Sequence, residues 1–184
     1  RTLVLSGLNT GEACKNYYWK DTAFSATFNA FGASQSGLLS GSIPQCIYQL
    51  PYLQIFHAGG NSFFGEPPLS ASPSSSANGA QSSVSLVDID VSFNRLTGTI
   101  SSALAAQLGS SGSLQRLNMA FNRISGDLNI FDTTRAGGSG AALFLSGEKS
   151  LSLDVNRLSG SIPASFLSVE HISILAGNVF GCSG

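Results

Sequence analysis

Few side chains in this sequence are suited to catalysis, and they are scattered. His57 and His171 lie far apart in the chain, and neither accompanies a nucleophile motif such as Gly-x-Ser-x-Gly, which does not occur. Asp88 and Asp90 alternate, which places two carboxylates on one face of a strand, as a hydrolase pair would require. Alternation is also what any exposed strand face shows. The sequence therefore predicts no catalytic residues and no enzyme.

The three cysteines do not form a metal site. Cys14 and Cys46 lie early and could pair across an N-terminal cap, whereas Cys182 has no partner in view. An odd count indicates a missing partner or a free thiol, and no Cys-x-x-Cys or Cys/His spacing indicates zinc. The sequence predicts no metal and no cofactor. A possible disulfide favours an oxidising compartment, either outside the cell or in an organelle lumen.

The charge content is low. Charged residues make up 10% of the chain and the net charge is −1, whereas ordinary soluble domains carry roughly 25% charged residues. This balance gives no electrostatic reason to expect nucleic acid as a partner. No apolar run approaches the ~20 residues that a membrane helix needs. We therefore expect a polar, mostly neutral surface and no membrane insertion.

A repeated sequence unit determines where all the remaining residues are positioned. Val91–Ile100 returns as Met119–Leu128 and again as Leu153–Pro163. The shared order is apolar, two residues, Asn, one residue, apolar, one residue, Gly, one residue, apolar. A unit stated several times indicates a repeat array, and apolar residues that alternate before each Asn indicate a short half-buried strand.

The asparagine of each unit is predicted to be structural. Its side chain carries both a carbonyl and an amide, so a buried copy can pair with backbone groups that the strands leave unpaired. One copy per repeat would stack into a ladder. The predicted ladder residues are Asn61, Asn94, Asn122, Asn156 and Asn178.

The repeats divide the chain into a regular array with a cap and insertions. Helix-forming residues at Ala103–Leu108 predict a helical turn between strands, with a shorter one at Ala164–Val169. Polar stretches without apolar period predict surface loops. The predicted divisions are a cap or degenerate first repeat at 1–36, about six repeats at 37–180, insertions at 69–83 and 132–142, and the start of a C-terminal cap at 181–184.

The repeat resembles a known family. Leu39–Pro44 and Leu158–Pro163 both read Leu-Ser-Gly-Ser-Ile-Pro, and the full unit resembles the plant-type leucine-rich repeat of extracellular receptor ectodomains and polygalacturonase-inhibiting proteins. The repeats are diverged, because insertions interrupt them and Ser101 and Asn129 stand where the family has proline. The resemblance implies a leucine-rich-repeat solenoid (α/β), with short parallel strands on the concave face and loops and short helical or 3-10 turns on the convex face.

The resemblance also implies an exposed concave face, formed by the residues between and after the buried strand positions. In register these residues give three rows across neighbouring strands. The first row is Ile55, Asp88, Arg116 and Ser150. The second row is His57, Asp90, Asn118 and Ser152. The third row is Gly59, Ser92, Ala120 and Asp154.

These rows predict one polar patch. Asp88 should lie one strand from Arg116, close enough to pair. The residues predicted to bind a partner are His57, Asp88, Asp90, Arg116, Asn118 and Asp154. The alternative is that they only solvate a strand face.

A basic stripe is also predicted, because Arg95, Arg123 and Arg157 each follow a ladder asparagine. It is either a solvated edge or an anion site.

Two functions remain open. The first is a non-catalytic recognition module that binds another protein or a cell-wall glycan through its rigid concave sheet. The second is a structural subunit of a larger extracellular or lumenal assembly. The mixed rows do not form the flat, regular Thr or Asn array that ice binding would need.

Overall fold

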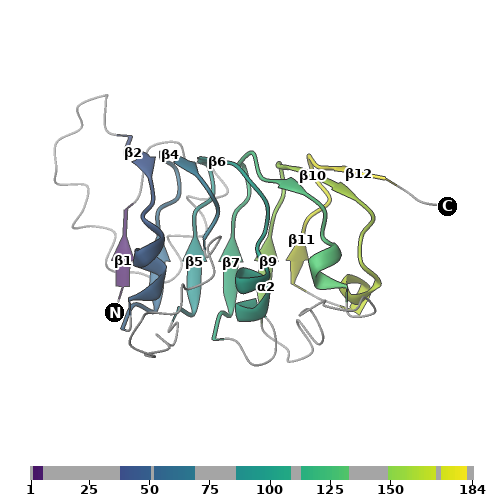
Figure 1. The fold of residues 1–184 in the computed structure, drawn as a ribbon, viewed down its shortest axis with the longest axis horizontal. Coiled ribbons are helices and arrows are strands. Elements are labelled where there is room, and N and C mark those ends of the chain that lie inside the picture. The colour runs from purple at the N-terminus through teal and green to yellow at the C-terminus, as the bar shows by residue number, and fades with distance from the viewer. Residues whose placement is uncertain are drawn as a thin grey trace, which may run out of the picture.

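The structure of this chain is a computed structural model that describes residues 2–5, 38–50, 52–68, 86–108, 113–132, 149–168 and 171–181. Within these residues the chain winds through successive turns. Figure 1 shows the strands standing side by side from β1 to β11, with a second set of strands along the upper edge. Each turn therefore supplies one strand to a main sheet and a second strand to its flank.

The main sheet is parallel and follows the chain order β1-β3-β5-β7-β9-β11. The middle residue of each of its four central strands is apolar and buried, as the alternating pattern predicts. These central residues are Phe56, Ile89, Leu117 and Leu151. The strands are β1 (Thr2–Val4), β3 (Ile55–His57), β5 (Asp88–Asp90), β7 (Arg116–Asn118), β9 (Ser150–Ser152) and β11 (Ile172–Ser173).

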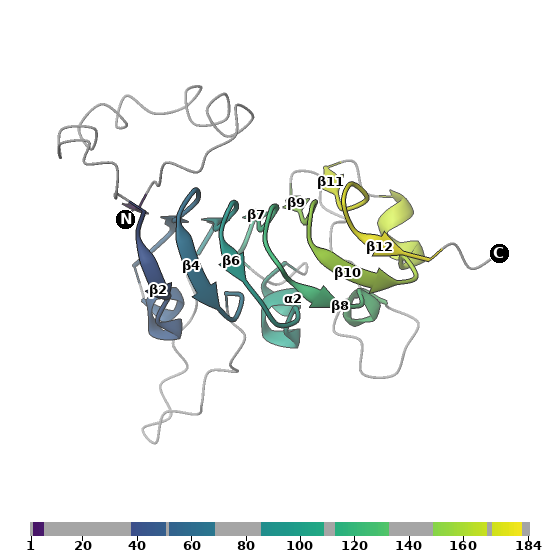
Figure 2. The ribbon, with the colours of Figure 1, turned by 90° about the horizontal axis from the view of Figure 1, so that it is seen from above.

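The second strands form two short parallel sheets along the flank (Figure 2). Main-chain hydrogen bonds continue between the two sheets, from Ser125 N–H to the Gly98 carbonyl at 2.8 Å. Gly126 in this row has a φ of +94°, and a Cβ there would lie 2.9 Å from Thr99, so the turn requires glycine. The strands are β2 (Ser40–Ser42), β4 (Ser62–Gly65), β6 (Arg95–Leu96), β8 (Ser125–Gly126), β10 (Arg157–Gly160) and β12 (Val179–Phe180).

Short helical segments connect the flank back to the main sheet (Figure 1). The helix predicted at Ala103–Leu108 is confirmed as α2 (Ser102–Leu108), and the shorter one after Ala164 is the 3-10 turn η4. The 3-10 turns are η2 (Gln45–Gln49), η3 (Asn129–Phe131) and η4 (Ala164–Ser168). The fold class is therefore the predicted one.

The two departures from the family's proline have a physical reason. The Ser101 hydroxyl accepts a hydrogen bond from Leu104 N–H at 3.1 Å, which is an N-cap for α2. Asn129 N–H donates to the Asp127 carboxylate at 2.9 Å at the start of η3. Proline has neither a side-chain acceptor nor an N–H, so both positions use groups that proline lacks.

The asparagine ladder is confirmed. The Asn94 side-chain carbonyl accepts from Phe63 N–H at 3.0 Å, and its amide donates to the carbonyls of Ala58 and Val91 at 2.9 and 3.1 Å. Asn61, Asn122, Asn156 and Asn178 repeat this arrangement one turn at a time. Each asparagine therefore joins its own turn to the preceding one.

A buried lysine fixes α2 to the next turn. Lys149 Nζ donates to the carbonyl of Leu108, the last residue of α2, at 3.1 Å. A cation is favourable there because the helix dipole is negative at that end and the last carbonyls lack helical partners. Burial lowers the pKa of Lys149. Nothing in the repeat pattern identified this residue.

The N-terminal residues belong to the same architecture. Residues 2–5, which fall in the predicted cap or degenerate first repeat, begin the main sheet as β1, with Val4 paired to His57. Cys46 lies exposed on η2, and the possible Cys14–Cys46 disulfide stays a prediction because Cys14 lies outside the described residues.

Some predictions fall outside the described residues. They are Cys14 and Cys182 themselves, the insertion at 69–83, and the insertion at 132–142 beyond Asp132. No helix within the described ranges is long and apolar enough to cross a bilayer. The divisions of the chain into cap, repeats and insertions stay predictions.

Candidate functional site

The structure contains the first two rows of strand side chains in the register that the sequence predicts. Main-chain pairing places Asp88 between Ile55 and Arg116, and Arg116 beside Ser150. The second row runs from His57 through Asp90 and Asn118 to Ser152 in the same register. The repeat spacing alone therefore identified which side chains are neighbours across four strands.

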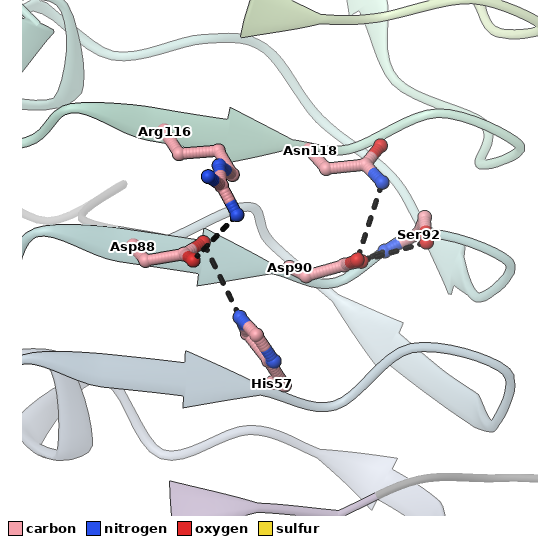
Figure 3. A network of polar contacts seen from close by, with 6 residues as sticks. All are labelled: His57, Asp88, Asp90, Ser92, Arg116 and Asn118. Atoms are coloured by element: carbon pink, nitrogen blue, oxygen red, sulfur yellow. Dashed lines mark hydrogen bonds and ion pairs between the residues drawn. The ribbon is translucent and has the colours of Figure 1, made fainter. Parts of the chain in front are cut away.

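Three of these side chains form a charged cluster, which we call the Asp88 cluster (Figure 3). Asp88 Oδ1 lies 3.3 Å from His57 Nε2, and Asp88 Oδ2 lies 3.3 Å from Arg116 Nη1. The exposed side-chain fractions are 16% for His57, 13% for Asp88 and 41% for Arg116. The predicted Asp88–Arg116 pair is confirmed, and His57 joins it from the opposite strand.

Asp88 is the central residue of the Asp88 cluster. Its carboxylate uses a different oxygen for each neighbour: Oδ2 accepts a hydrogen bond from Arg116 Nη1, and Oδ1 lies 3.3 Å from His57 Nε2. The carboxylate is mostly buried while the guanidinium of Arg116 is nearly half exposed. The cluster therefore offers part of a fixed guanidinium and an imidazole edge at the surface of the sheet.

Asp90 is not the exposed residue that the sequence predicted. It is 2% exposed, and its carboxylate accepts from Ser92 N–H at 2.9 Å, Ser92 Oγ–H at 2.7 Å and Asn118 Nδ2–H at 3.2 Å (Figure 3). These donors replace water around the charge, which is what allows a carboxylate to be buried. Asp90 therefore holds the end of β5 and is not a contact residue.

The third predicted row is also mostly buried. Gly59, Ser92 and Ala120 lie inside the fold, because the chain turns inward after each strand toward the ladder asparagine. Only Asp154 of this row is accessible. Its carboxylate accepts from the Ser173 hydroxyl and from Ala176 N–H at 3.2 Å, so it faces the last turn and stays apart from the Asp88 cluster.

Sequence reasoning missed an apolar feature beside this patch. Phe93 and Phe121 each precede a ladder asparagine, and their rings stack with centroids 4.2 Å apart and planes at 10°. The signal was available, because both occupy the same position of the repeat. This position of the repeat was interpreted as part of the structural scaffold.

The described residues contain no group of three His, Cys, Asp or Glu side chains that could hold a metal ion.

The arrangement as a whole defines a leucine-rich-repeat solenoid. Short parallel strands form one face, a ladder asparagine that is buried in four of the five cases follows each of five main-sheet strands, and helical or 3-10 turns return the chain. The plant-type repeat that the sequence resembles is the type found among its solved structural neighbours.

These neighbours are plant proteins. The BIR2 ectodomain from Arabidopsis thaliana is 26% identical with a TM-score of 0.53, over 80% of this chain and 66% of that chain. The plant peptide hormone receptor RGFR1, solved in complex with RGF2, is 25% identical with a TM-score of 0.54, over 78% of this chain and 20% of that chain. A plant ice-binding protein shares the fold at 23% identity and a TM-score of 0.53, over 77% of this chain and 39% of that chain.

The likeness has defined limits. No protein-family model and no curated protein matches the sequence. The chain spans 66% of the BIR2 ectodomain and only 20% of RGFR1. The comparisons therefore establish the leucine-rich-repeat fold and its likeness to plant ectodomains.

Proposed function

We propose that this chain is a non-catalytic recognition module that binds a protein or peptide through the Asp88 cluster on its main sheet. The single observation that carries the proposal is the cluster itself. His57, Asp88 and Arg116 come from three neighbouring strands and are held by one shared carboxylate. Asn118, two positions after Arg116 on β7, extends the candidate surface, whereas Asp154 faces the last turn.

The physical basis is preorganisation. A long side chain that is immobilised on binding costs about 0.5–1.5 kcal/mol, and arginine is among the residues that most often dominate an interface. Asp88 restrains Arg116 before any partner arrives. The partner should therefore present a carboxylate or carbonyl acceptor to the accessible edge of this guanidinium.

The structural neighbours support the same class of function. RGFR1 was solved with RGF2 bound, and the BIR2 chain is an ectodomain. By likeness to them we place this chain outside the cell or in an organelle lumen, as part of a protein that recognises and does not catalyse. Affinity capture would identify the partner.

The experiment is an affinity capture from the native source with the wild-type chain, followed by mass spectrometry. Asp88→Ala and Arg116→Ala should each lose the captured partner. Asp127→Asn is the matched control, because it neutralises an exposed carboxylate on the flank and keeps an acceptor for Asn129 N–H. Equal capture by wild type and folded Asp88→Ala would contradict the proposal.

The alternative of a structural subunit rests on exposed apolar residues in the last described turn, where Leu175 and Val179 face solvent. Such a subunit would copurify with a large assembly and would keep that association in Asp88→Ala and Arg116→Ala. Leu175→Ser with Val179→Ser would release it. A free monomer in native extract would eliminate this alternative.

A further inference from the structure

Six residues on three successive turns form a second surface, which we call the Phe/Arg strip. Phe93, Phe121 and Val155 each precede a ladder asparagine, and an arginine follows each of the same asparagines. The arginines are Arg95, Arg123 and Arg157. Each apolar residue and its arginine are two positions apart, so their Cα atoms lie within about 7.6 Å. The strip is distinct from the Asp88 cluster and does not rest on the function proposed for it.

The apolar half of the strip is kept in a strained conformation. The φ angles of Phe93, Phe121 and Val155 are 53°, 56° and 52°, in the left-handed region that bulky and β-branched residues avoid. Gly60 and Gly177 occupy the same position in other turns, with φ of 74° and 66°. Glycine would relieve the strain at all three sites, so the bulky side chains are retained at a cost to folding.

Two of these side chains are exposed and the third, Phe93, is half-buried. Phe121 is 43% exposed, and its ring stacks on Phe93 so that each ring covers a face of the other. Val155 continues the row on the next turn and is also exposed. The result is an apolar ridge that runs along the solenoid axis.

The basic half of the strip holds every unpaired cation that the structure describes. The side chains of Arg95, Arg123 and Arg157 are exposed and make no hydrogen bond or ion pair within the described residues. The other two described cations, Arg116 and Lys149, are engaged by Asp88 and by the Leu108 carbonyl.

The row of arginines is regular. Arg123 N–H donates to the Leu96 carbonyl and Arg157 N–H to the Ile124 carbonyl, so the three arginines lie on successive turns of the solenoid. They are not directly opposite one another, because Arg157 pairs with Ser125. Like charges on successive turns repel. Asp127 and Asp154 form no ion pair with these arginines, and their carboxylates accept from Asn129 N–H and from Ser173 and Ala176. The row is therefore suited to bind an anion that carries regularly spaced charges.

We infer that the Phe/Arg strip binds a linear polysaccharide that carries carboxylate or sulfate groups. A sugar ring has an apolar C–H face that can cover the ridge, and the guanidinium fork pairs with planar or tetrahedral oxyanions. A polymer can present one charge per successive arginine. Single-stranded nucleic acid fits less well, because its bases need free aromatic faces and Phe93 and Phe121 already cover one another.

The experiment is affinity electrophoresis of the folded chain in gels that contain polygalacturonate, its fully methyl-esterified form, dextran sulfate or single-stranded oligonucleotide. Polygalacturonate or dextran sulfate should retard the wild type, and the retardation should fall with salt, since exposed charges are screened beyond about 10 Å at 0.1 M. Which of the two binds more tightly identifies the oxyanion. The esterified polymer, with the same backbone and no charge, should bind about tenfold more weakly or not at all.

Two variants test the two halves of the strip. Substituting all three arginines by glutamine should weaken binding about tenfold. Phe93→Gly with Phe121→Gly removes the ridge while relieving backbone strain, so it should stay folded and also lose about tenfold. Tyr52→Ala is the matched aromatic control, because Tyr52 is exposed away from the strip. Arg116→Gln tests whether net charge alone explains binding, and it should bind as wild type does.

Several outcomes would overturn the inference. They are no retardation of the wild type by either charged polysaccharide, unchanged binding in the triple glutamine variant, equal binding of the esterified polymer, equal loss in Arg116→Gln, or tighter binding of the oligonucleotide than of either polysaccharide.

Discussion

The Asp88 cluster and the Phe/Arg strip are built from the same repeat but by opposite means. Register places unlike residues on neighbouring strands in the cluster, so His57 and Arg116 share the carboxylate of Asp88. In the strip the repeat places like residues on successive turns, such as Arg95 and Arg123. Pairing unlike charges stabilises the free protein. Repeating like charges on successive turns causes repulsion in the free protein, which an anionic ligand would relieve.

The difference teaches how a solenoid separates stability from binding. The ladder asparagines fix the backbone of both surfaces, so neither surface has to stabilise the fold. A cluster whose charges are mutually satisfied can offer only its exposed edges, and it suits a partner of matched shape. A strained and unpaired row suits a repeating polymer.

The largest effect should come from the scaffold that both surfaces share. Asn122→Ala removes the acceptor of Leu96 N–H and the donor to the carbonyls of Val91 and Met119. Leaving several buried backbone groups unpaired should lower the free energy of unfolding by about 3–5 kcal/mol. Urea denaturation followed by circular dichroism measures this loss. Asn178→Ala, in a less buried position, should cost less, and an equal cost would contradict the ladder's role.

The next effect should come from breaking the pairing in the Asp88 cluster. Asp88→Ala leaves His57 and Arg116 without their shared carboxylate, which should cost about 1–2 kcal/mol because Arg116 can still reach water. Arg123→Ala removes an unpaired exposed arginine and should change stability by less than about 0.5 kcal/mol. Denaturation midpoints of the two variants compare the surfaces directly. Equal losses would mean that the strip is also paired.

The sequence predicts the pairing of Asp88 with Arg116 but not the burial of Asp90. The register of Asp88 with Arg116 followed from repeat spacing, because parallel strands one turn apart preserve position. The burial of Asp90 did not follow, since it depends on where the chain turns inward and on donors from Ser92 and Asn118.

The sequence predicted the arginine stripe but not the rest of the Phe/Arg strip, for a related reason. Arg95 and its two equivalents were recognised as a stripe, but their lack of partners depends on where Asp127 and Asp154 point. The strain at Phe93 and Phe121 is a matter of backbone angle, which a composition of apolar and polar positions does not encode. Repeat spacing therefore predicts neighbours, while charge satisfaction and strain require coordinates.

A smaller effect should appear at alkaline pH and only on the side of the cluster. Tyr48 is buried against Phe56, the centre of β3, with ring centroids 5.3 Å apart. Burial raises the pKa of Tyr48 above its ordinary value. Because the folded pKa is the higher one, its contribution to stability is fully present below about pH 10 and is lost as pH rises through the alkaline range, by up to about 1.4 kcal/mol per pH unit.

The check is a set of unfolding curves from neutral to alkaline pH for wild type and Tyr48→Phe. The variant should lose less stability above about pH 10 than wild type. Within the described residues the Tyr48 hydroxyl has no hydrogen-bond partner, so the variant should also be at least as stable at neutral pH. Parallel curves for the two proteins would contradict the burial argument.

The smallest effect, and the most specific, concerns strain in the strip. Phe121→Gly relieves a left-handed backbone at about 1–2 kcal/mol but loses a stacked pair at about 0.5–1.5 kcal/mol, so its stability should stay within about 1 kcal/mol of wild type. Phe121→Ala loses the stack and keeps the strain, and it should be the less stable of the two. Glycine usually destabilises relative to alanine, so the reverse order in thermal melts is diagnostic. The usual order would show that the position is unstrained.

The most direct test of the account is the dissociation constant of the captured partner, measured by calorimetry for wild type, Asp88→Ala and the control Asp127→Asn, each shown to be folded. The account predicts that Asp88→Ala weakens binding about tenfold or more while Asp127→Asn binds as wild type does. A dissociation constant that is unchanged in folded Asp88→Ala would contradict recognition through the Asp88 cluster.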